Sequence, residues 1–202
     1  MILALDTSGG ELLLALVDGP RVLAGLARRG GRHQDFVLGA IADVAGGRLA
    51  DVDAIAVARG PGSHTGLRVG LSAAAGLAFA RRLQIYPISS LDVAAQRAPD
   101  GRGRVKAVVG AGRGRVFVQD FDRQGSRRLP RGSRVLCRID DFDGDGAITA
   151  AEPDLVGVLA PGSAARLRDG AKALAAAVIQ AADGAGGVNY DQLKGDYGES
   201  SE

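Results

Sequence analysis

The sequence of 202 residues contains one cysteine, Cys137, and no long run of apolar residues. A single cysteine excludes a disulfide within the chain. The longest apolar stretch, residues 71–80, is interrupted by Gly76 and followed by two arginines, so it is too short to span a bilayer. The sequence also shows no basic, cleavable leader at its start. We therefore expect a cytoplasmic protein, and its hydrophobic content of 46% is enough for a sizeable core.

The net charge is only +2, but the charges are unevenly distributed along the chain. Residues 97–138 hold twelve basic and three acidic side chains, whereas residues 139–202 hold four basic and twelve acidic ones. A basic middle segment is able to contact a nucleic-acid backbone. The same arginines are equally expected to pair with the acidic C-terminal part, so the charge pattern leaves both interpretations open.

Local patterns predict an α/β fold. Apolar segments between turn-rich links predict antiparallel strands, and helical spacing with capping residues predicts helices separated by short strands. The expected strands are 2–5, 11–17, 21–27, 54–58 and 85–88, and the expected helices are 33–45, 66–82 and 90–97. This order is typical of the ribonuclease-H-like lobe of actin-like and sugar-kinase-like ATPases.

Two further strands, 104–109 and 116–121, surround a glycine-rich loop and are expected to repeat the first hairpin. We therefore predict an actin-like (ribonuclease-H-like) fold of duplicated lobes, the second divergent or incomplete. A strand over 155–159 and a helix over 164–182 are expected further on. The predicted division is an N-terminal lobe of residues 1–100, a second lobe of residues 101–183 with an acidic loop, and a mobile tail of residues 184–202.

The segment 56–70 predicts a strand, a tight elbow and a helix. Gly60 and Gly62 permit backbone conformations closed to other residues, and Ser63 or Thr65 can cap the helix that follows. Free N–H groups at a helix N-terminus also bind phosphates. The glycine spacing, however, matches neither the dinucleotide fingerprint nor the P-loop, and the loop has no lysine. A structural elbow is therefore favoured over a nucleotide site.

Four segments together resemble the TsaB (YeaZ) family. They read Ile-Leu-Ala-Leu-Asp-Thr-Ser from residue 2, His-Gln at residues 33–34, Gly-Pro-Gly-Ser-His-Thr-Gly-Leu-Arg-Val-Gly from residue 60, and Pro-Ile-Ser-Ser-Leu from residue 87. The resemblance covers residues 1–97. It implies a non-catalytic dimerisation and activating subunit for the complex that installs threonylcarbamoyl on adenosine 37 of tRNA. A TsaD-like transferase and a TsaE-like ATPase are the implied partners, with tRNA contacted through the complex, a homodimer as a further arrangement, and no required cofactor.

The helix after the elbow carries a candidate interface. Gly66, Gly70, Ala74 and Ala78 recur every fourth residue, so one helix face has little bulk and another helix can approach it closely. The family implies that helix 33–45 supplies the other half of the surface. The alternative is that the small-residue face packs on the chain's own sheet. The candidate interface residues are His33, Phe36, Val37, Gly66, Leu67, Gly70, Leu71 and Ala74.

Asp6, Thr7 and Ser8 follow the first strand, where ATP-using relatives of the superfamily place a phosphate loop. The family's second hairpin usually reads D-A-R-x-G-E-V-[FY], whereas this chain has glycine or alanine at 110–112 and lacks both carboxylates. We therefore expect only a remnant of that loop and no ATP binding. A residual actin-like ATPase or a glycoprotease-like peptidase is the alternative. The metal site of a glycoprotease-like peptidase would need paired histidines on one helix, and His33 and His64 stand in separate elements.

Residues 141–152 match the calcium-loop pattern D-x-[DN]-x-[DN]-G-x5-E at every specified position. The flanks fit less well, because no confident helix precedes the loop and Pro153 follows it. The segment is therefore either a calcium site, which would suit a calcium-responsive binding protein as a second functional alternative, or an exposed acidic turn. The candidate calcium ligands are Asp141, Asp143, Asp145, the Ala147 carbonyl, Thr149 and Glu152.

Overall fold

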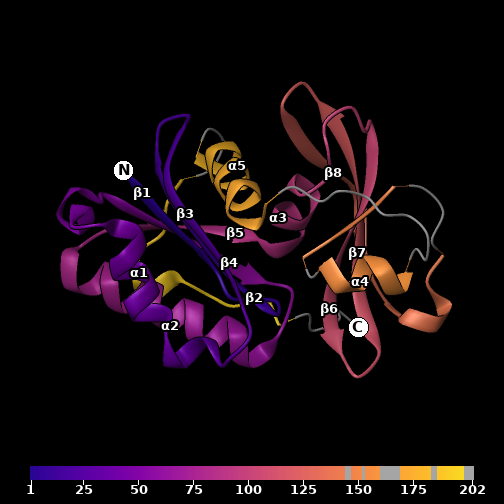
Figure 1. The fold of residues 1–202 in the computed structure, drawn as a ribbon, viewed down its shortest axis with the longest axis horizontal. Coiled ribbons are helices and arrows are strands. Elements are labelled where there is room, and N and C mark those ends of the chain that lie inside the picture. Colours follow the sequence, from indigo (N-terminus) through magenta and orange to yellow (C-terminus); the bar gives the residue numbers. More distant parts are fainter. Residues whose placement is uncertain (144–146, 152, 160–168, 183–185, 198–202) are drawn as a thin grey trace.

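The computed structural model describes all residues except 144–146, 152, 160–168, 183–185 and 198–202. It consists of two lobes side by side, each built on one β-sheet (Figure 1). None of the described helices combines the length and hydropathy needed to cross a membrane.

The sheet of the first lobe has the strand order β3-β2-β1-β4-β5. An antiparallel meander is formed by β1 (Ile2–Asp6), β2 (Glu11–Asp18) and β3 (Arg21–Arg29), and β4 (Ala54–Gly60) and β5 (Gln84–Ser89) continue the sheet in parallel with β1. The central strands are buried on both faces, which explains why they read as continuous apolar runs rather than as alternating ones.

Helices cover both faces of this sheet. On one face lie α1 (Val37–Ala45) and α2 (His64–Arg81), and on the other lie α3 (Ser90–Gln96) and α5 (Gly170–Ala182). The predicted helix 33–45 begins later than expected, because its first residues form a separate 3-10 turn, η1 (His33–Asp35). A second such turn, η2, links α1 to β4 and spans Arg48–Asp51.

The second lobe repeats the strand order of the first. Its sheet runs β8-β7-β6-β9, with an antiparallel meander of β6 (Arg104–Gly112), β7 (Arg115–Gln124) and β8 (Arg127–Arg138), and with β9 (Ile148–Ala150) parallel to β6. This order corresponds to β3-β2-β1-β4, and within the described residues no strand corresponds to β5. The predicted duplicated fold with an incomplete second lobe is thus confirmed.

One expectation for the latter part of the chain was wrong, and two strands were missed. Residues 155–159 belong to a helix, α4 (Pro153–Leu159), because Pro153 and Asp154 suit the first turn of a helix and the apolar run that follows does not alternate. The strands β8 and β9 were not predicted, since β8 is rich in arginine and contains Pro130 and Gly132. Helix α5 is described from Gly170, and the start of the expected helix lies outside the described residues.

The division at residue 100 also needs correction, because α5 belongs to the first lobe. Leu174 and Val178 of α5 are fully buried against Leu13 and Ala15 of β2. A Cβ on Gly25 of β3 would lie 2.9 Å from the Ala171 side chain, so the helix sits close on the sheet. The range 101–183 therefore contains the second lobe and, in addition, a helix of the first lobe.

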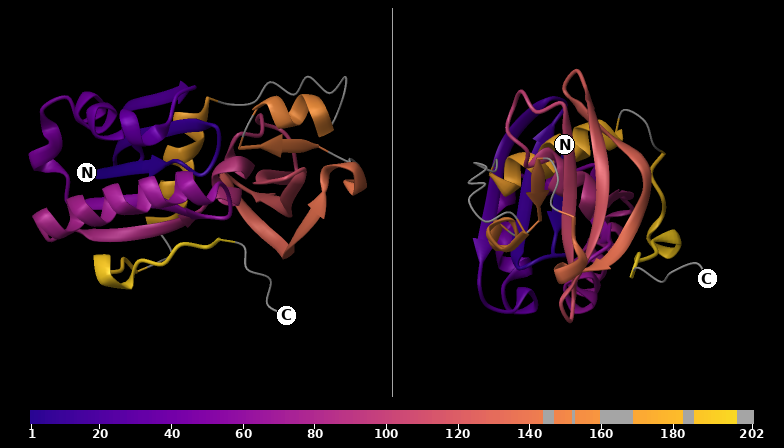
Figure 2. Two further views of the ribbon diagram at one scale, coloured as in Figure 1. Left: turned by 90° about the horizontal axis from the view of Figure 1, so that it is seen from below. Right: turned by 90° about the vertical axis from the view of Figure 1, so that its right-hand side faces the viewer.

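Residues 186–197, part of the tail predicted to be mobile, lie along the first lobe (Figure 2). Val188 pairs with Ile85 of β5, and a short 3-10 turn, η4 (Tyr190–Gln192), follows. The polar composition of this segment concealed the fact that its backbone can pair with the edge of a sheet.

Candidate functional site

The loop after β1 is packed beneath α2. Asp6, Thr7 and Ser8 are all buried, and the Asp6 carboxylate accepts a hydrogen bond of 2.8 Å from the Ser8 backbone N–H. Burial raises the pKa of Asp6, although the hydrogen bonds with Ser8 act in the opposite direction. The Thr7 hydroxyl donates to the Gly66 carbonyl over 2.7 Å. The Asp6 carboxylate and the Thr7 hydroxyl, predicted as part of a phosphate-loop remnant, are thus engaged in contacts within the first lobe.

The small-residue face of α2 lies against this loop. A Cβ on Gly66 would collide with the Thr7 carbonyl oxygen, and a Cβ on Gly70 would collide with the Thr7 hydroxyl. Leu67, Leu71 and Ala74 on the same face are buried in the core of the first lobe. The predicted interface was therefore wrong for these five residues, and the alternative that the face packs on the chain's own sheet is correct.

The remaining three predicted interface residues lie around α1. His33 is half-buried, and burial lowers its pKa, partly offset by a hydrogen bond to the Thr7 backbone. The ring of Phe36 lies under the guanidinium of Arg28, 4.0 Å from ring centre to Cζ. Val37 is buried at 5% exposure but lines a surface groove. Of the three, Val37 alone borders the groove described next.

A groove of about 650 Å³ separates α1 from the outward side of α2. Its walls are largely apolar, and Leu38 of α1 is 65% exposed beside it. Gly76 lies toward the C-terminal end of the α2 side, where an added Cβ would meet no atom within 4 Å. The residues that line the groove are Gln34, Val37, Leu38, Thr65, Arg68, Val69, Ser72, Ala73, Gly76 and Leu77. We call this groove the α1–α2 groove.

A second hollow of about 710 Å³, the inter-lobe pocket, lies where the two lobes meet. The first lobe contributes Gly9 and Gly10 and the start of α2, and the second lobe contributes the glycine-rich tip of β6 together with Arg115. The sequence analysis did not predict this pocket, because its lining residues come from five separate parts of the sequence. Its lining residues are Gly9, Gly10, Gly62, Ser63, His64, Thr65, Gly110, Ala111, Gly112, Arg115, Phe117, Leu136 and Tyr197.

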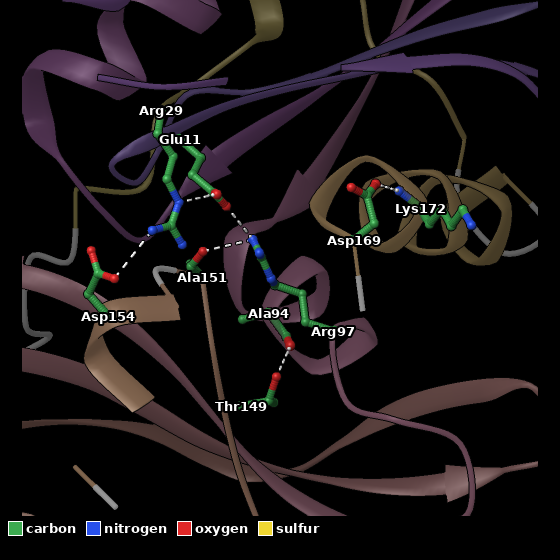
Figure 3. A network of polar contacts seen from close by, with 9 residues as sticks. All are labelled: Glu11, Arg29, Ala94, Arg97, Thr149, Ala151, Asp154, Asp169 and Lys172. Atoms are coloured by element: carbon green, nitrogen blue, oxygen red, sulfur yellow. Dashed lines mark hydrogen bonds and ion pairs between the residues drawn. The ribbon is translucent and has the colours of Figure 1, made fainter. Parts of the chain in front are cut away.

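A network of ion pairs around the buried Arg97 joins the lobes, and the sequence analysis missed it (Figure 3). One Arg97 nitrogen donates to the Glu11 carboxylate over 2.7 Å and to the Ala151 carbonyl over 2.9 Å. Arg29 bridges the other oxygen of Glu11, at 2.7 Å, to Asp154, at 3.2 Å. Arg97 is 4% exposed and Glu11 10%, so water screens their attraction poorly. No local pattern links residues so distant in the sequence.

The predicted calcium ligands divide between two environments. Thr149 lies in β9 and donates its hydroxyl to the Ala94 carbonyl over 2.8 Å, so its side chain points to α3 rather than toward the acidic loop (Figure 3). The Ala147 carbonyl accepts from the Lys106 N–H in the sheet. Asp141 ends the 3-10 turn η3 (Ile139–Asp141), and Asp143 follows it. Asp145 and Glu152 lie outside the described residues.

The calcium interpretation is weakened at Thr149 and stays a prediction for the loop as a whole. No α-helix precedes the loop, since β8 and η3 stand before it, although α4 follows it from Pro153. Among the residues that the structure describes, no three histidine, cysteine, aspartate or glutamate side chains come together as metal ligands would. The two acidic ligands outside the description, Asp145 and Glu152, carry much of the predicted charge of the site.

Comparison with known proteins identifies the family. The model of the TsaD family, described as tRNA N6-adenosine threonylcarbamoyltransferase, matches residues 33–154. The "tRNA threonylcarbamoyladenosine biosynthesis protein TsaB" of Escherichia coli is 35% identical over 127 residues, which cover 60% of this chain and 55% of that protein. The counterpart from Haemophilus influenzae is 43% identical over 102 residues, 48% of this chain and 42% of that protein. The chain thus matches about half the length of these curated relatives.

A solved structure agrees over nearly the whole chain. A protein from Pseudomonas aeruginosa described as similar to peptidase YeaZ is 30% identical, with a TM-score of 0.77 and coverage of 97% of this chain and 98% of that one. The overall fold is therefore shared with that structure rather than peculiar to this sequence. The chain belongs to the TsaB (YeaZ) family, within the group of proteins that the TsaD family model describes.

Proposed function

We propose that the chain is a non-catalytic dimerisation and activating subunit of the complex that installs threonylcarbamoyl on adenosine 37 of tRNA, and that it binds a TsaD-like transferase. The names of its curated relatives support this function, since they are called tRNA threonylcarbamoyladenosine biosynthesis proteins. A TsaE-like ATPase and tRNA belong to the same proposal and meet this chain within the complex. Without the transferase, a second copy of the chain would occupy the same binding surface.

The observation that carries the proposal is the α1–α2 groove. Along the outward side of α2, Val69, Ser72, Gly76 and Phe79 follow the alternating spacing of three and four residues that is typical of helices packed against another helix. The centre of this row is small and its last member is a phenylalanine at 64% exposure. An exposed apolar surface on two adjacent helices is characteristic of protein interfaces. A partner helix can therefore approach the backbone of α2 at Gly76.

The loop after β1 supports a binding role rather than catalysis. The Thr7 hydroxyl is engaged by Gly66, and Asp6 is buried with a raised pKa, which disfavours the charged carboxylate that metal or phosphate chemistry would use. Opposite it across the inter-lobe pocket stand Gly110 and Gly112, where a nucleotide-handling site would need acidic side chains.

Leu38→Asp tests the proposal directly. Leu38 is 65% exposed beside the groove, so the aspartate should not unfold the chain, but it would place a charge in an apolar contact. We expect at least a tenfold loss of affinity for the TsaD-like protein of the same cell, measured by titration calorimetry. Reconstituted modification of tRNA should fall in parallel.

Val158→Asp is the matched control, because Val158 is 59% exposed on α4 of the second lobe, away from the groove. It should leave both measurements unchanged. Equal losses for the two variants would remove the groove from the proposal, and a wild-type chain that neither binds the transferase nor supports tRNA modification would overturn the function itself.

A further inference from the structure

The C-terminal segment, residues 186–197, is attached first to the edge of the first lobe. Val188 and Ile85 exchange both backbone hydrogen bonds, at 2.7 and 2.8 Å, and so cover part of the outer edge of β5. Two residues further on, the ring of Tyr190 stands edge to face on Phe79 of α2, with 5.1 Å between ring centres. These contacts involve the first lobe alone.

The segment then reaches the elbow between β4 and α2. The Asp196 N–H donates to the Arg59 carbonyl over 2.6 Å. A Cβ on Gly60 would collide with the Asp196 carbonyl oxygen and would lie 2.9 Å from its carbonyl carbon. Gly60 also has a φ of +124°, which other residues rarely adopt. Glycine at this position therefore admits the C-terminal backbone as well as the turn.

The Asp196 side chain binds the other lobe. Its carboxylate pairs with the guanidinium of Arg134 on β8 through both oxygens, one of them at 2.9 Å from Nη2. The two side chains are 34% and 24% exposed. Two-point pairing between a guanidinium and a carboxylate is stronger and more directional than an ordinary surface ion pair. Asp196 is thus held by its backbone to the first lobe and by its side chain to the second.

Tyr197 completes one wall of the inter-lobe pocket. Its ring lies 4.5 Å from the ring of His64, centre to centre, at the first residue of α2. The pocket lining on the opposite side includes Arg115 and the glycine-rich tip of β6. Access to the pocket from the side of His64 therefore depends on where the C-terminal segment lies.

Charge favours the same arrangement. Residues 186–202 contain four acidic side chains and one basic one, Lys194, whereas residues 97–138 contain twelve basic and three acidic ones. Attraction between these parts draws the segment toward the second lobe.

We propose that residues 186–197 are an intramolecular clasp that fastens the second lobe to the first and closes one side of the inter-lobe pocket. The Arg134–Asp196 pair is its releasable fastening, and Val188 is its anchor. When the pair breaks, residues 193–197 leave the elbow and the pocket opens beside His64, while the strand contact at Ile85 persists. This inference does not depend on which partner occupies the α1–α2 groove.

Cleavage of the full-length chain after Lys194 by endoproteinase Lys-C tests the clasp. Lys194 lies inside the clasp, and a protease needs the local backbone to open before it can cut. Asp196→Asn should raise the cleavage rate about fivefold, the change in open population expected for a loss of about 1 kcal/mol. Asp191→Asn is the matched control, since it removes the same charge from an exposed position of the same segment and should leave the rate unchanged.

The reversed pair distinguishes the contact from a general effect of charge. Arg134→Asp alone should accelerate cleavage as Asp196→Asn does, and the double variant Arg134→Asp with Asp196→Arg should return toward the wild-type rate. Each rate is divided by that of the same variant unfolded in urea, which removes any preference of the protease for the altered sequence.

Hydrogen exchange supplies the second readout. In Asp196→Asn, amides of residues 59–66 and 193–197 should exchange faster, while those of β1 and α5 stay protected. The clasp would be overturned if Asp196→Asn left the cleavage rate unchanged. It would also be overturned if the double variant were cleaved no more slowly than the single variants. Faster exchange throughout both lobes would overturn it too, because the pair would then support the whole fold rather than fasten one segment.

Discussion

The two sides of α2 carry glycines for opposite reasons. On the inward side, Gly66 and Gly70 allow the loop after β1 to lie so close that any Cβ would collide with Thr7. On the outward side, an added Cβ at Gly76 would meet no atom within 4 Å. The inward glycines are needed for the fold of the single chain, whereas the outward one leaves room for another molecule. Small residues at helical spacing therefore indicate a close approach, but they do not say whether the approaching element belongs to the same chain.

Gly66→Ala should produce the largest effect, because it breaks the inward contact. The atom in the way is the Thr7 backbone oxygen, which cannot move without shifting β1. We expect the free energy of unfolding in urea to fall by about 2 to 3 kcal/mol, the upper range for overpacking. A loss below about 0.5 kcal/mol would show that the inward side is loosely packed.

Gly76→Leu tests the outward side. The larger side chain would fill one end of the α1–α2 groove and weaken binding of the TsaD-like transferase at least tenfold, which corresponds to about 1.4 kcal/mol. The free energy of unfolding of the isolated chain should stay within about 0.5 kcal/mol of wild type. Titration calorimetry and urea unfolding measure the two quantities on one preparation. An unfolding defect with intact binding would reverse the assignment of the two sides.

Gly76→Ala sharpens the comparison with Gly66→Ala, since the same substitution is made on the same helix. Alanine restricts the unfolded chain and favours the helix, so the free energy of unfolding should rise by about 0.5 to 1 kcal/mol. The same urea titration applies. A decrease in stability would mean that the outward side is packed against part of the chain itself.

The pH dependence of stability tests the inward side through the contribution of Asp6. Burial raises the pKa of Asp6 in the folded chain above its unfolded value of 3.8, so folding favours the neutral carboxyl. Its contribution to stability is fully present below pH 3.8 and is lost as the pH rises through the folded pKa. Asp6→Asn keeps an acceptor for the Ser8 N–H but does not titrate, and its unfolding free energy should lack this decline. A pH profile of Asp6→Asn parallel to that of wild type would contradict the prediction. Gly76→Ala is the control, and its free energy of unfolding should still decline with pH as in wild type.

The first lobe was predictable because its signals are local. Its strands are continuous apolar runs, and Ser63 and Ser89 accept backbone hydrogen bonds at the starts of α2 and α3, as capping residues do. The elbow followed from Gly60 and Gly62, although its contact with the C-terminal segment did not. In the second lobe, only the hairpin of β6 and β7 followed from the sequence, as a repeat of the first hairpin.

The features that escaped prediction depend on distant partners. Strand β8 is an edge strand with arginines on both sides, so it lacks the alternation that marks a half-buried strand. Arg97 reads as the polar end of a short helix, and its partner Glu11 stands 86 positions earlier. The choice of face on α2 was wrong because both faces are rich in small residues, and only the position of Thr7 decides which one turns inward. Pairing of Arg134 with Asp196 supports the interpretation in which basic and acidic parts of the chain attract one another.

The position of α5 affects how the chain folds as it leaves the ribosome. The first sheet and the helices α1, α2 and α3 are complete by residue 96, but one face of that sheet is covered by a helix that ends at Ala182. At a synthesis rate of about 5 to 20 residues per second, the apolar surface of β1, β2 and β4 remains open for roughly 4 to 17 seconds. During this interval the nascent first lobe exposes apolar surface of the kind that chaperones bind, and α5, which is made last, covers it.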